Sequence, residues 1–197
     1  MNKTGNKLSV ILLFAAVTAV FVLLATQSRE VRAGNIDVPD YVDVQLIDVD
    51  GEARSGIKLD CVNDIVIHYV GNPNTTAQNN RDWFNEPETH VSSHFIIGLD
   101  GEVIQCVPLS EKSSASNHRN RDTISIEVCH PDDSGKFTEA SYASLVKLTA
   151  WLCSSYGLTE NNVIRHYDVT GKECPLYFVQ HEDAWQQFRA DVRENIK

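Results

Sequence analysis

The sequence has few basic residues for its length, with 17 Lys and Arg against 27 Asp and Glu among 197 residues and a formal net charge of −10. Residues 1–33 hold four of the basic residues and one of the acidic ones, so 13 basic and 26 acidic side chains remain in residues 34–197. Nucleic-acid binding depends on Lys and Arg side chains that neutralise phosphates. The shortage therefore argues against a nucleic-acid partner and against non-specific adhesion to anionic polymers or lipid headgroups.

The sequence also lacks internal repeats and low-complexity stretches. The roughly 160 residues after the N-terminal segment suit one domain with one hydrophobic core. We expect this domain to cover residues 40–197 and to be monomeric, with residues 27–39 as a short tether.

The N-terminal segment contains a long apolar run, residues 8–25, without a charged side chain. As a helix with a rise of 1.5 Å per residue it would span about 27 Å, close to the hydrocarbon thickness of a bilayer. Lys3 and Lys7 precede it and favour a cytoplasmic N-terminus. We therefore expect residues 1–26 to be a signal anchor that crosses the cell membrane once, with the domain outside the cytoplasm. The alternative is secretion after signal cleavage, for which Val31-Arg32-Ala33 is a poor site.

A histidine, a lysine and a cysteine lie close together in the segment 165–175, RHYDVTGKECP. Imidazole nitrogen and thiolate sulfur both bind zinc, so His166 and Cys174 are candidate ligands, although such a pair taken alone usually consists of loop or core residues. Lys172 lies two residues before Cys174, and in an extended segment both side chains point to the same face. A cation there would meet negative charge that develops on a substrate oxygen, which suggests hydrolysis.

A third candidate ligand, His68, interrupts the apolar run of segment 64–73, DIVIHYVGNP. The run predicts a buried strand, in which a histidine is often a core residue bonded to a backbone carbonyl. Because the strand ends at Gly71-Asn72-Pro73, His68 lies near its carboxyl end, where open α/β sheets bind ligands. Two His and one Cys leave one position of tetrahedral zinc open, as in catalytic sites.

Four separated segments resemble, in order, the zinc-dependent N-acetylmuramoyl-L-alanine amidases, which share a fold with bacteriophage T7 lysozyme and peptidoglycan-recognition proteins. The segments are IVIHYVGNP, SSHFIIGLDG, TISIEV and RHYDVTGKECP, and the resemblance covers roughly residues 40–190. It implies an α/β fold with a mixed central β-sheet flanked by helices, and zinc bound by His68, His166 and Cys174. It also implies hydrolysis, in bacterial peptidoglycan, of the amide between N-acetylmuramic acid and the L-alanine of the stem peptide.

Glu127 lies in the alternating segment 123–128, TISIEV, on the face opposite the isoleucines. A carboxylate in such a position is commonly solvated. The resemblance implies instead that Glu127 faces the zinc as the general base, a role that burial favours by raising the pKa toward neutrality. Some relatives use a Tyr at the position that Ser93 occupies here. The resemblance also gives Lys172 a role beside zinc in stabilising the oxyanion.

Three further residues are candidates for substrate contacts through the resemblance. His94 matches a histidine that is not a ligand in relatives, and a plain strand-end histidine is an equal alternative. Asn117 and His118 belong to a polar loop that lines the substrate groove in relatives but is elsewhere often a mere surface connection. Where many relatives carry Gly after the Cys-Pro pair, this chain has the segment 176–178, LYF, which changes the groove wall. Asp168 is expected to cap a loop rather than to bind metal.

Two other kinds of protein remain as alternatives. A non-catalytic muropeptide-binding module has the same fold but typically lacks the Cys ligand. A structural zinc domain would need a fourth protein ligand, from His94 or His130. The cysteines other than Cys174 allow three disulfide pairings, or none if all are reduced: Cys61, Cys106, Cys129 and Cys153.

Periodicity and turn residues predict the elements that carry these motifs. Asp100-Gly101 is a hairpin turn signal between two strands. Tyr142, Leu145 and Leu152 lie at helical spacing before Gly157, as do Trp185, Phe188 and Val192 further on. We expect strands near 43–48, 64–70, 94–99, 102–106, 123–129 and 163–166, and helices near 76–85, 138–156 and 181–195.

Overall fold

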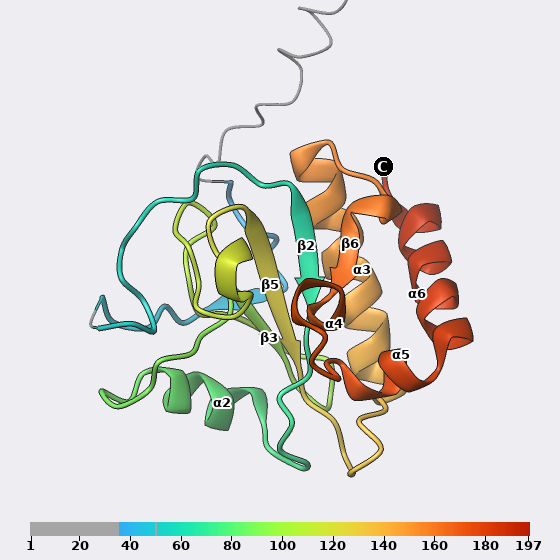
Figure 1. Ribbon diagram of the computed structural model, residues 1–197, viewed down its shortest axis with the longest axis horizontal. Coiled ribbons are helices and arrows are strands. Elements are labelled where there is room, and N and C mark those ends of the chain that lie inside the picture. Colours follow the sequence, from blue (N-terminus) through green and yellow to red (C-terminus); the bar gives the residue numbers. More distant parts are fainter. Residues whose placement is uncertain (1–35, 50) are drawn as a thin grey trace, which may run out of the picture. The chain divides into compact units, whose positions relative to one another are not determined.

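The computed structural model describes residues 36–49 and 51–197 (Figure 1). The predicted anchor at 1–26 and most of the predicted tether lie outside these residues. Within the described part of the chain, no helix is both long enough and apolar enough to cross a membrane.

The centre of the domain is a mixed six-stranded sheet with the order β1-β4-β3-β5-β2-β6. Neighbouring strands are parallel except β3 and β4, which are antiparallel. The predicted α/β fold with a mixed sheet is therefore confirmed. The strands are β1 (Val42–Val44), β2 (Asp64–Ile67), β3 (Phe95–Ile97), β4 (Val103–Gln105), β5 (Thr123–Val128) and β6 (Val163–Arg165).

Each predicted strand is present, but most are shorter than expected. The predicted strand 64–70 ends as β2 at Ile67, although the backbone N–H groups of His68 and Val70 still donate to carbonyls of β5, at 2.8 and 3.1 Å. The expected hairpin between β3 and β4 is confirmed. Gly101 has a φ of 84°, which side-chain-bearing residues rarely adopt, and its N–H donates to the Gly98 carbonyl at 3.1 Å.

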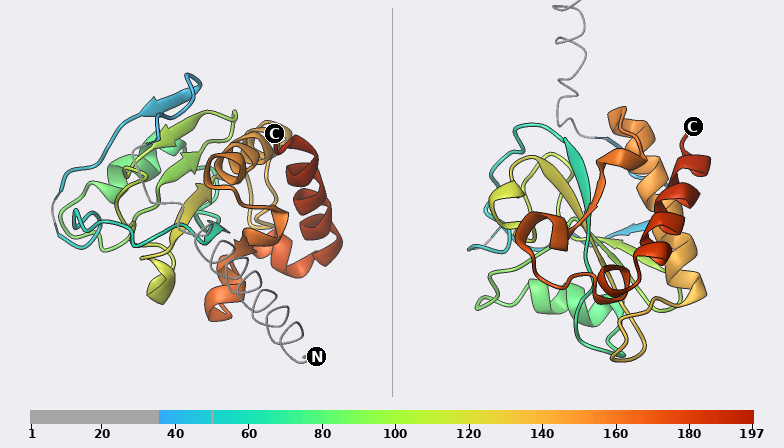
Figure 2. Two further views of the ribbon diagram at one scale, coloured as in Figure 1. Left: turned by 90° about the horizontal axis from the view of Figure 1, so that it is seen from above. Right: turned by 45° about the vertical axis from the view of Figure 1, so that its right-hand side comes forward.

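The two faces of the sheet differ because side chains alternate along each strand. Register places Ile65 and Ile67 of β2 beside Ile124 and Ile126 of β5, and all four are fully buried on one face. Helix α3 (Glu139–Tyr156) contacts β2 and β3, and α6 (Glu182–Asn195) packs beside α3 (Figures 1 and 2). Both helices lie where periodicity predicts them, and α3 ends at Gly157 in the left-handed conformation.

The opposite face carries Ser125 and Glu127 of β5. Helix α2 (Ala77–Phe84) covers part of it by packing Ala77 and Phe84 into a buried cluster with Ile96 of β3. Ile96 pairs with Glu127 in the register of β3 and β5, so α2 lies on the face that bears Glu127.

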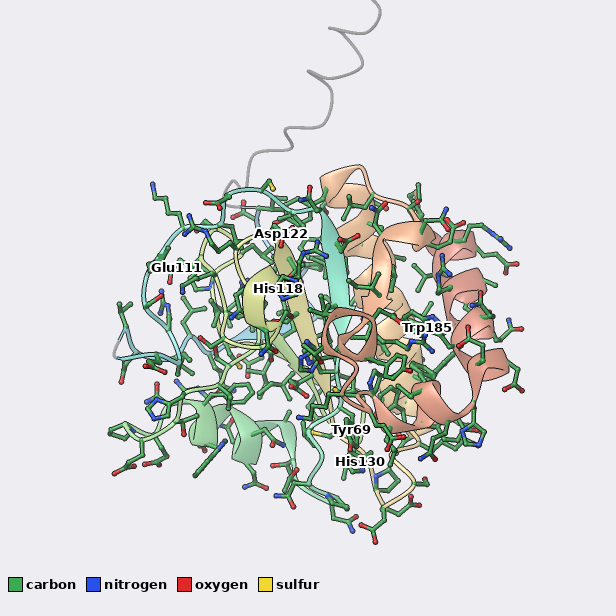
Figure 3. All side chains as sticks on the ribbon, in the orientation of Figure 1. Tyr69, Glu111, His118, Asp122, His130 and Trp185 are labelled. Atoms are coloured by element: carbon green, nitrogen blue, oxygen red, sulfur yellow. The ribbon has the colours of Figure 1, made fainter. Side chains whose placement is uncertain are left out.

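Several short helices are absent from the sequence prediction because three to five residues are too few to show a period. The segment LYF, predicted to change the groove wall, forms the first three residues of α5 (Leu176–Gln180). Its Phe178 stacks on Phe188 of α6, with 5.3 Å between the ring centroids. Trp185, labelled in Figure 3, lies 5.5 Å from Phe178 in the same cluster. These helices are η1 (Asn117–Arg119), η2 (Glu160–Asn162), α4 (His166–Thr170) and α5 (Leu176–Gln180).

Candidate active site

The three predicted zinc ligands lie together. The ligand atoms of His68, His166 and Cys174 are all within 4.8 Å of one another. Cys174 Sγ is 3.8 Å from His68 Nδ1, and the two imidazole rings are 4.5 Å apart between centroids. All three side chains are buried, although they are separated by up to 106 positions in the chain.

The fold explains how these side chains meet. Strands β2 and β6 are parallel, with Ile67 paired to Arg165, so the residues directly after them, His68 and His166, lie side by side at the carboxyl edge. Helix α4 begins at His166 and ends at Gly171, which has a φ of 78°. The chain then turns back, and the Tyr167 N–H donates to the Cys174 carbonyl at 2.8 Å. This return brings the thiol beside the imidazoles.

Glu127 reaches the same point from β5, the strand on the other side of β2. Its Oε1 is 3.8 Å from His68 Nδ1, while its Oε2 is buried and has no hydrogen-bond partner in the described part of the chain. Burial raises the pKa of Glu127 to about 8, against the opposing effect of the Lys172 charge. The side chain is only 18 % exposed. Glu127 therefore does not behave as a solvated carboxylate on a polar strand face.

The protonation states of the two candidate histidine ligands suit the binding of a cation. Burial, together with the charges of His166 and Lys172, holds the pKa of His68 well below its usual range, and burial also lowers the pKa of His166. Both imidazoles are thus neutral near pH 7, with a lone pair available. Burial raises the pKa of the Cys174 thiol to about 12. Two imidazoles and a thiol that can lose its proton form a donor set that fits zinc, and the unpartnered oxygen of Glu127 lies beside this set without belonging to it.

The site opens into a cleft of about 620 Å³. Lys172 is exposed and lines this cleft together with Cys174, as the two-residue spacing predicts. Trp83 of α2, 56 % exposed, and Val91, 49 % exposed, add apolar surface to the cleft. Sequence reasoning missed both residues, because neither an exposed aromatic in a polar helix nor a single exposed valine has a distinctive local pattern.

The three residues proposed for substrate contacts have different surroundings. Asn117 lines the cleft, and its Oδ1 is 3.0 Å from His166 Nε2. His118 is exposed on η1 (Figure 3) and does not line the cleft. His94 is fully buried behind the cleft wall, with Nδ1 3.1 Å from Ser125 Oγ and Nε2 2.9 Å from the Glu111 carbonyl.

Within residues 36–49 and 51–197, no fourth protein ligand joins the site. Among the described residues, the group able to hold a metal consists of the three predicted ligands, without His94 or His130. His130 Nδ1 is 2.7 Å from the Asp132 carbonyl, and its ring lies 5.1 Å from that of Tyr69 (Figure 3). Asp168 accepts from the Arg165 backbone N–H at 2.8 Å at the start of α4, which confirms its capping role. The open, three-ligand arrangement is the catalytic type.

Sequence reasoning also missed Ser116, whose Oγ is 3.3 Å from His68 Nε2. Ser116 belongs to a serine-rich loop, and nothing in the local sequence distinguishes it from its neighbours.

Comparison with known proteins places these features in a family. The family model described as N-acetylmuramoyl-L-alanine amidase matches residues 59–176. The chain is 31% identical over 163 residues to the N-acetylmuramoyl-L-alanine amidase CwlL of Bacillus licheniformis, a match that covers 74% of this chain and 45% of that protein. It is 29% identical over 171 residues to the N-acetylmuramoyl-L-alanine amidase BlyA of Bacillus subtilis (strain 168), covering 76% of this chain and 46% of that one. The chain thus spans less than half the length of these relatives.

Solved structures agree with the sequence comparison. A mutant endolysin from Bacillus subtilis superposes with a TM-score of 0.67 at 27% identity, covering 77% of this chain and 97% of that chain. The catalytic domain of XlyA gives a TM-score of 0.65 at 26% identity, covering 77% and 98%. The chain belongs to the N-acetylmuramoyl-L-alanine amidase family.

Proposed function

We propose that this protein is a zinc-dependent N-acetylmuramoyl-L-alanine amidase, which hydrolyses the amide between N-acetylmuramic acid and the L-alanine of the stem peptide in bacterial peptidoglycan. One observation carries the proposal: a buried carboxylate oxygen without a partner, on Glu127, lies beside three clustered metal-ligand side chains in an open cleft. The relatives CwlL and BlyA are named for the same activity.

His68, His166 and Cys174 would hold the metal. Zinc bound by these side chains supplies a Lewis acid for the scissile carbonyl and lowers the pKa of water. The side chains contribute two neutral imidazoles and one thiolate, and the thiol must lose its proton for this. The neutral state of the imidazoles follows from burial, which lowers the pKa of both.

Glu127 would move the proton. Its carboxylate takes a proton from the attacking water as the oxygen forms a bond to the carbonyl carbon. The same proton then passes to the nitrogen of the leaving L-alanine when the C–N bond breaks. A carboxyl group whose pKa burial raises to about 8 can both accept and return a proton near neutral pH.

Lys172 would stabilise the oxygen that becomes negative during the attack. Its ammonium group lines the cleft, and its charge lowers the pKa of Glu127, His68 and Cys174. A cation that lines the cleft beside these groups is suited to stabilise negative charge that develops on a substrate oxygen.

We also propose that residues 1–26 anchor a monomeric domain outside the cytoplasm, with secretion after signal cleavage as the alternative. The charge-free run at 8–25 behind Lys3 and Lys7 supports this. Fractionation of cells that produce the full chain should place it in the membrane after a carbonate wash. A soluble extracellular form with an N-terminus near residues 26–34 would contradict the anchor.

The proposed activity can be tested on purified peptidoglycan with the zinc-loaded full chain. Mass spectrometry should find released stem peptides with a free L-alanine amine, together with glycan strands that keep intact lactyl groups. The Glu127→Gln protein is the matched control and should release little. Tight binding to the wall material without any released peptide, in a protein shown to contain zinc, would favour the muropeptide-binding module instead.

A further inference from the structure

The loop that leads into η1 contacts both candidate zinc-binding imidazoles from their outer side. Ser116 Oγ is 3.3 Å from His68 Nε2, and Asn117 Oδ1 is 3.0 Å from His166 Nε2. Two adjacent residues of one loop therefore engage one nitrogen on each ring. The other nitrogen of His68, Nδ1, faces the site, 3.8 Å from both Cys174 Sγ and Glu127 Oε1.

This loop is held in place by its own hydrogen bonds. The Asn120 side-chain oxygen accepts from the backbone N–H groups of Ala115 and Ser116, at 3.1 and 2.6 Å. Ser116 is fully buried. Asn117 has a φ of 54°, a left-handed conformation that asparagine adopts more readily than most side-chain-bearing residues. The positions of Ser116 Oγ and Asn117 Oδ1 are therefore set by the backbone of the loop.

The Asn117 contact selects the nitrogen of His166 that carries the proton, and the Ser116 contact is compatible with the same choice in His68. An amide oxygen can only accept, so Asn117 Oδ1 requires a proton on His166 Nε2. A neutral imidazole protonated at Nε2 has its lone pair at Nδ1. The Ser116 hydroxyl oxygen can accept from His68 Nε2 in the same way, which leaves the His68 lone pair on the nitrogen that faces Cys174.

We propose that Ser116 and Asn117 are positioning residues that hold His68 and His166 in the Nε2-protonated tautomer and direct both Nδ1 atoms to zinc. The inference rests on the zinc site of the proposed function. It also gives Asn117 a role different from the substrate contact that the sequence suggests, since its oxygen is already engaged by a ligand ring.

The first test measures zinc affinity of the full chain in detergent by competition with a chelator at fixed pH. Ser116→Ala and Asn117→Gly should each weaken zinc binding by about 10- to 100-fold, the usual effect of losing a hydrogen-bond partner of a ligand. Glycine at 117 tolerates the positive φ, so the backbone is preserved. Asn117→Asp keeps an acceptor oxygen and should retain the parent affinity or exceed it.

Asn74 offers a matched control. Asn74 and Asn117 are the two non-glycine residues with positive φ in the described part of the chain, and Asn74 has a φ of 61°. Asn74 is exposed and does not line the cleft. Asn74→Gly makes the same chemical change at a similar backbone conformation and should leave zinc affinity unchanged. Melting temperatures of all variants without metal show whether each is folded.

The second test reads the tautomers directly from long-range ¹H–¹⁵N spectra of the metal-free parent. Both His68 and His166 should be protonated at Nε2, and Asn117→Gly should produce a mixture at His166 alone. Parent zinc affinity in both Ser116→Ala and Asn117→Gly, or an Nδ1-protonated His166 in the parent, would overturn the inference. If the variants change zinc affinity and tautomer as expected but the parent releases no stem peptide, the proposed function fails and the positioning role stands.

Discussion

Replacing Glu127 with glutamine tests the proposed base with little change in shape. Glutamine is nearly isosteric with glutamate, so packing against β2 and β3 should persist. It cannot take a proton from water, and it removes a buried carboxylate that has an unpaired oxygen and a pKa near 8. We therefore expect loss of turnover with little change in zinc content or substrate affinity, because proton transfer acts in the transition state.

The size of the effect follows from the role. A positioned general base contributes about 10²- to 10⁴-fold, which corresponds to roughly 2.7–5.5 kcal/mol of activation free energy. We expect a loss toward the upper end, because the raised pKa makes Glu127 a stronger base than an exposed carboxylate. The parent should also lose activity as the pH falls below the pKa of Glu127, since only the ionised carboxylate accepts a proton. The pKa of about 8 already includes the charge of Lys172, and the positive charge of bound zinc moves that midpoint lower.

The assay is kcat on a muramyl-peptide substrate from pH 5 to 9, with metal analysis of the same preparations. The Glu127→Gln protein should contain as much zinc as the parent and should lack the acidic limb of the pH profile. Turnover at the parent rate with full zinc would show that Glu127 is not the base. A protein that has lost its zinc would instead show that Glu127 acts on metal binding.

Three further predictions concern the same site. Cys174→Ser should weaken zinc binding by more than the roughly 100-fold effect of losing a hydrogen-bond partner of a ligand. The zinc affinity of the parent should rise about tenfold per pH unit from pH 7 to 9, because a thiol with a pKa near 12 releases one proton on binding while the imidazoles are already neutral. Equal zinc affinity in the serine variant would remove Cys174 from the site. Lys172→Ala should lower kcat by about 10²- to 10³-fold with zinc retained, and an unchanged kcat would exclude the oxyanion contact. Without metal, Glu127→Gln should be more stable than the parent at pH 8. The Glu127 carboxyl ionises near pH 4.5 in the unfolded chain but near 8 in the folded one, so the parent loses about 1.4 kcal/mol of folding stability per pH unit between these values. Thermal melts of the two proteins that coincide at both pH 5 and pH 8 would contradict the burial of a neutral carboxyl.

Local patterns in the sequence predicted the strands and the longer helices and made His68, His166 and Cys174 candidates, and the resemblance to the amidases selected them as the ligand set. Alternation in TISIEV places Glu127 opposite the isoleucines, and Gly71-Asn72-Pro73 places His68 at the end of its strand. Both placements are confirmed, because side-chain direction in a strand has a period of two and turn residues stop a strand wherever they occur. His68 and His166 meet because β2 and β6 are parallel neighbours, a strand order that local patterns do not give.

Tertiary structure alone decided how far those residues are buried and how they ionise. The alternation places Glu127 on the polar face, which fits either a solvated carboxylate or a buried general base. The burial of the side chain decides between these two interpretations. That burial exists only in the folded domain, and it raises the pKa of Glu127 to about 8. The contacts of Ser116 and Asn117 with the ligand rings span 48 and 49 positions in the chain. No local period or spacing encodes such contacts, because they depend on how separate segments pack against one another.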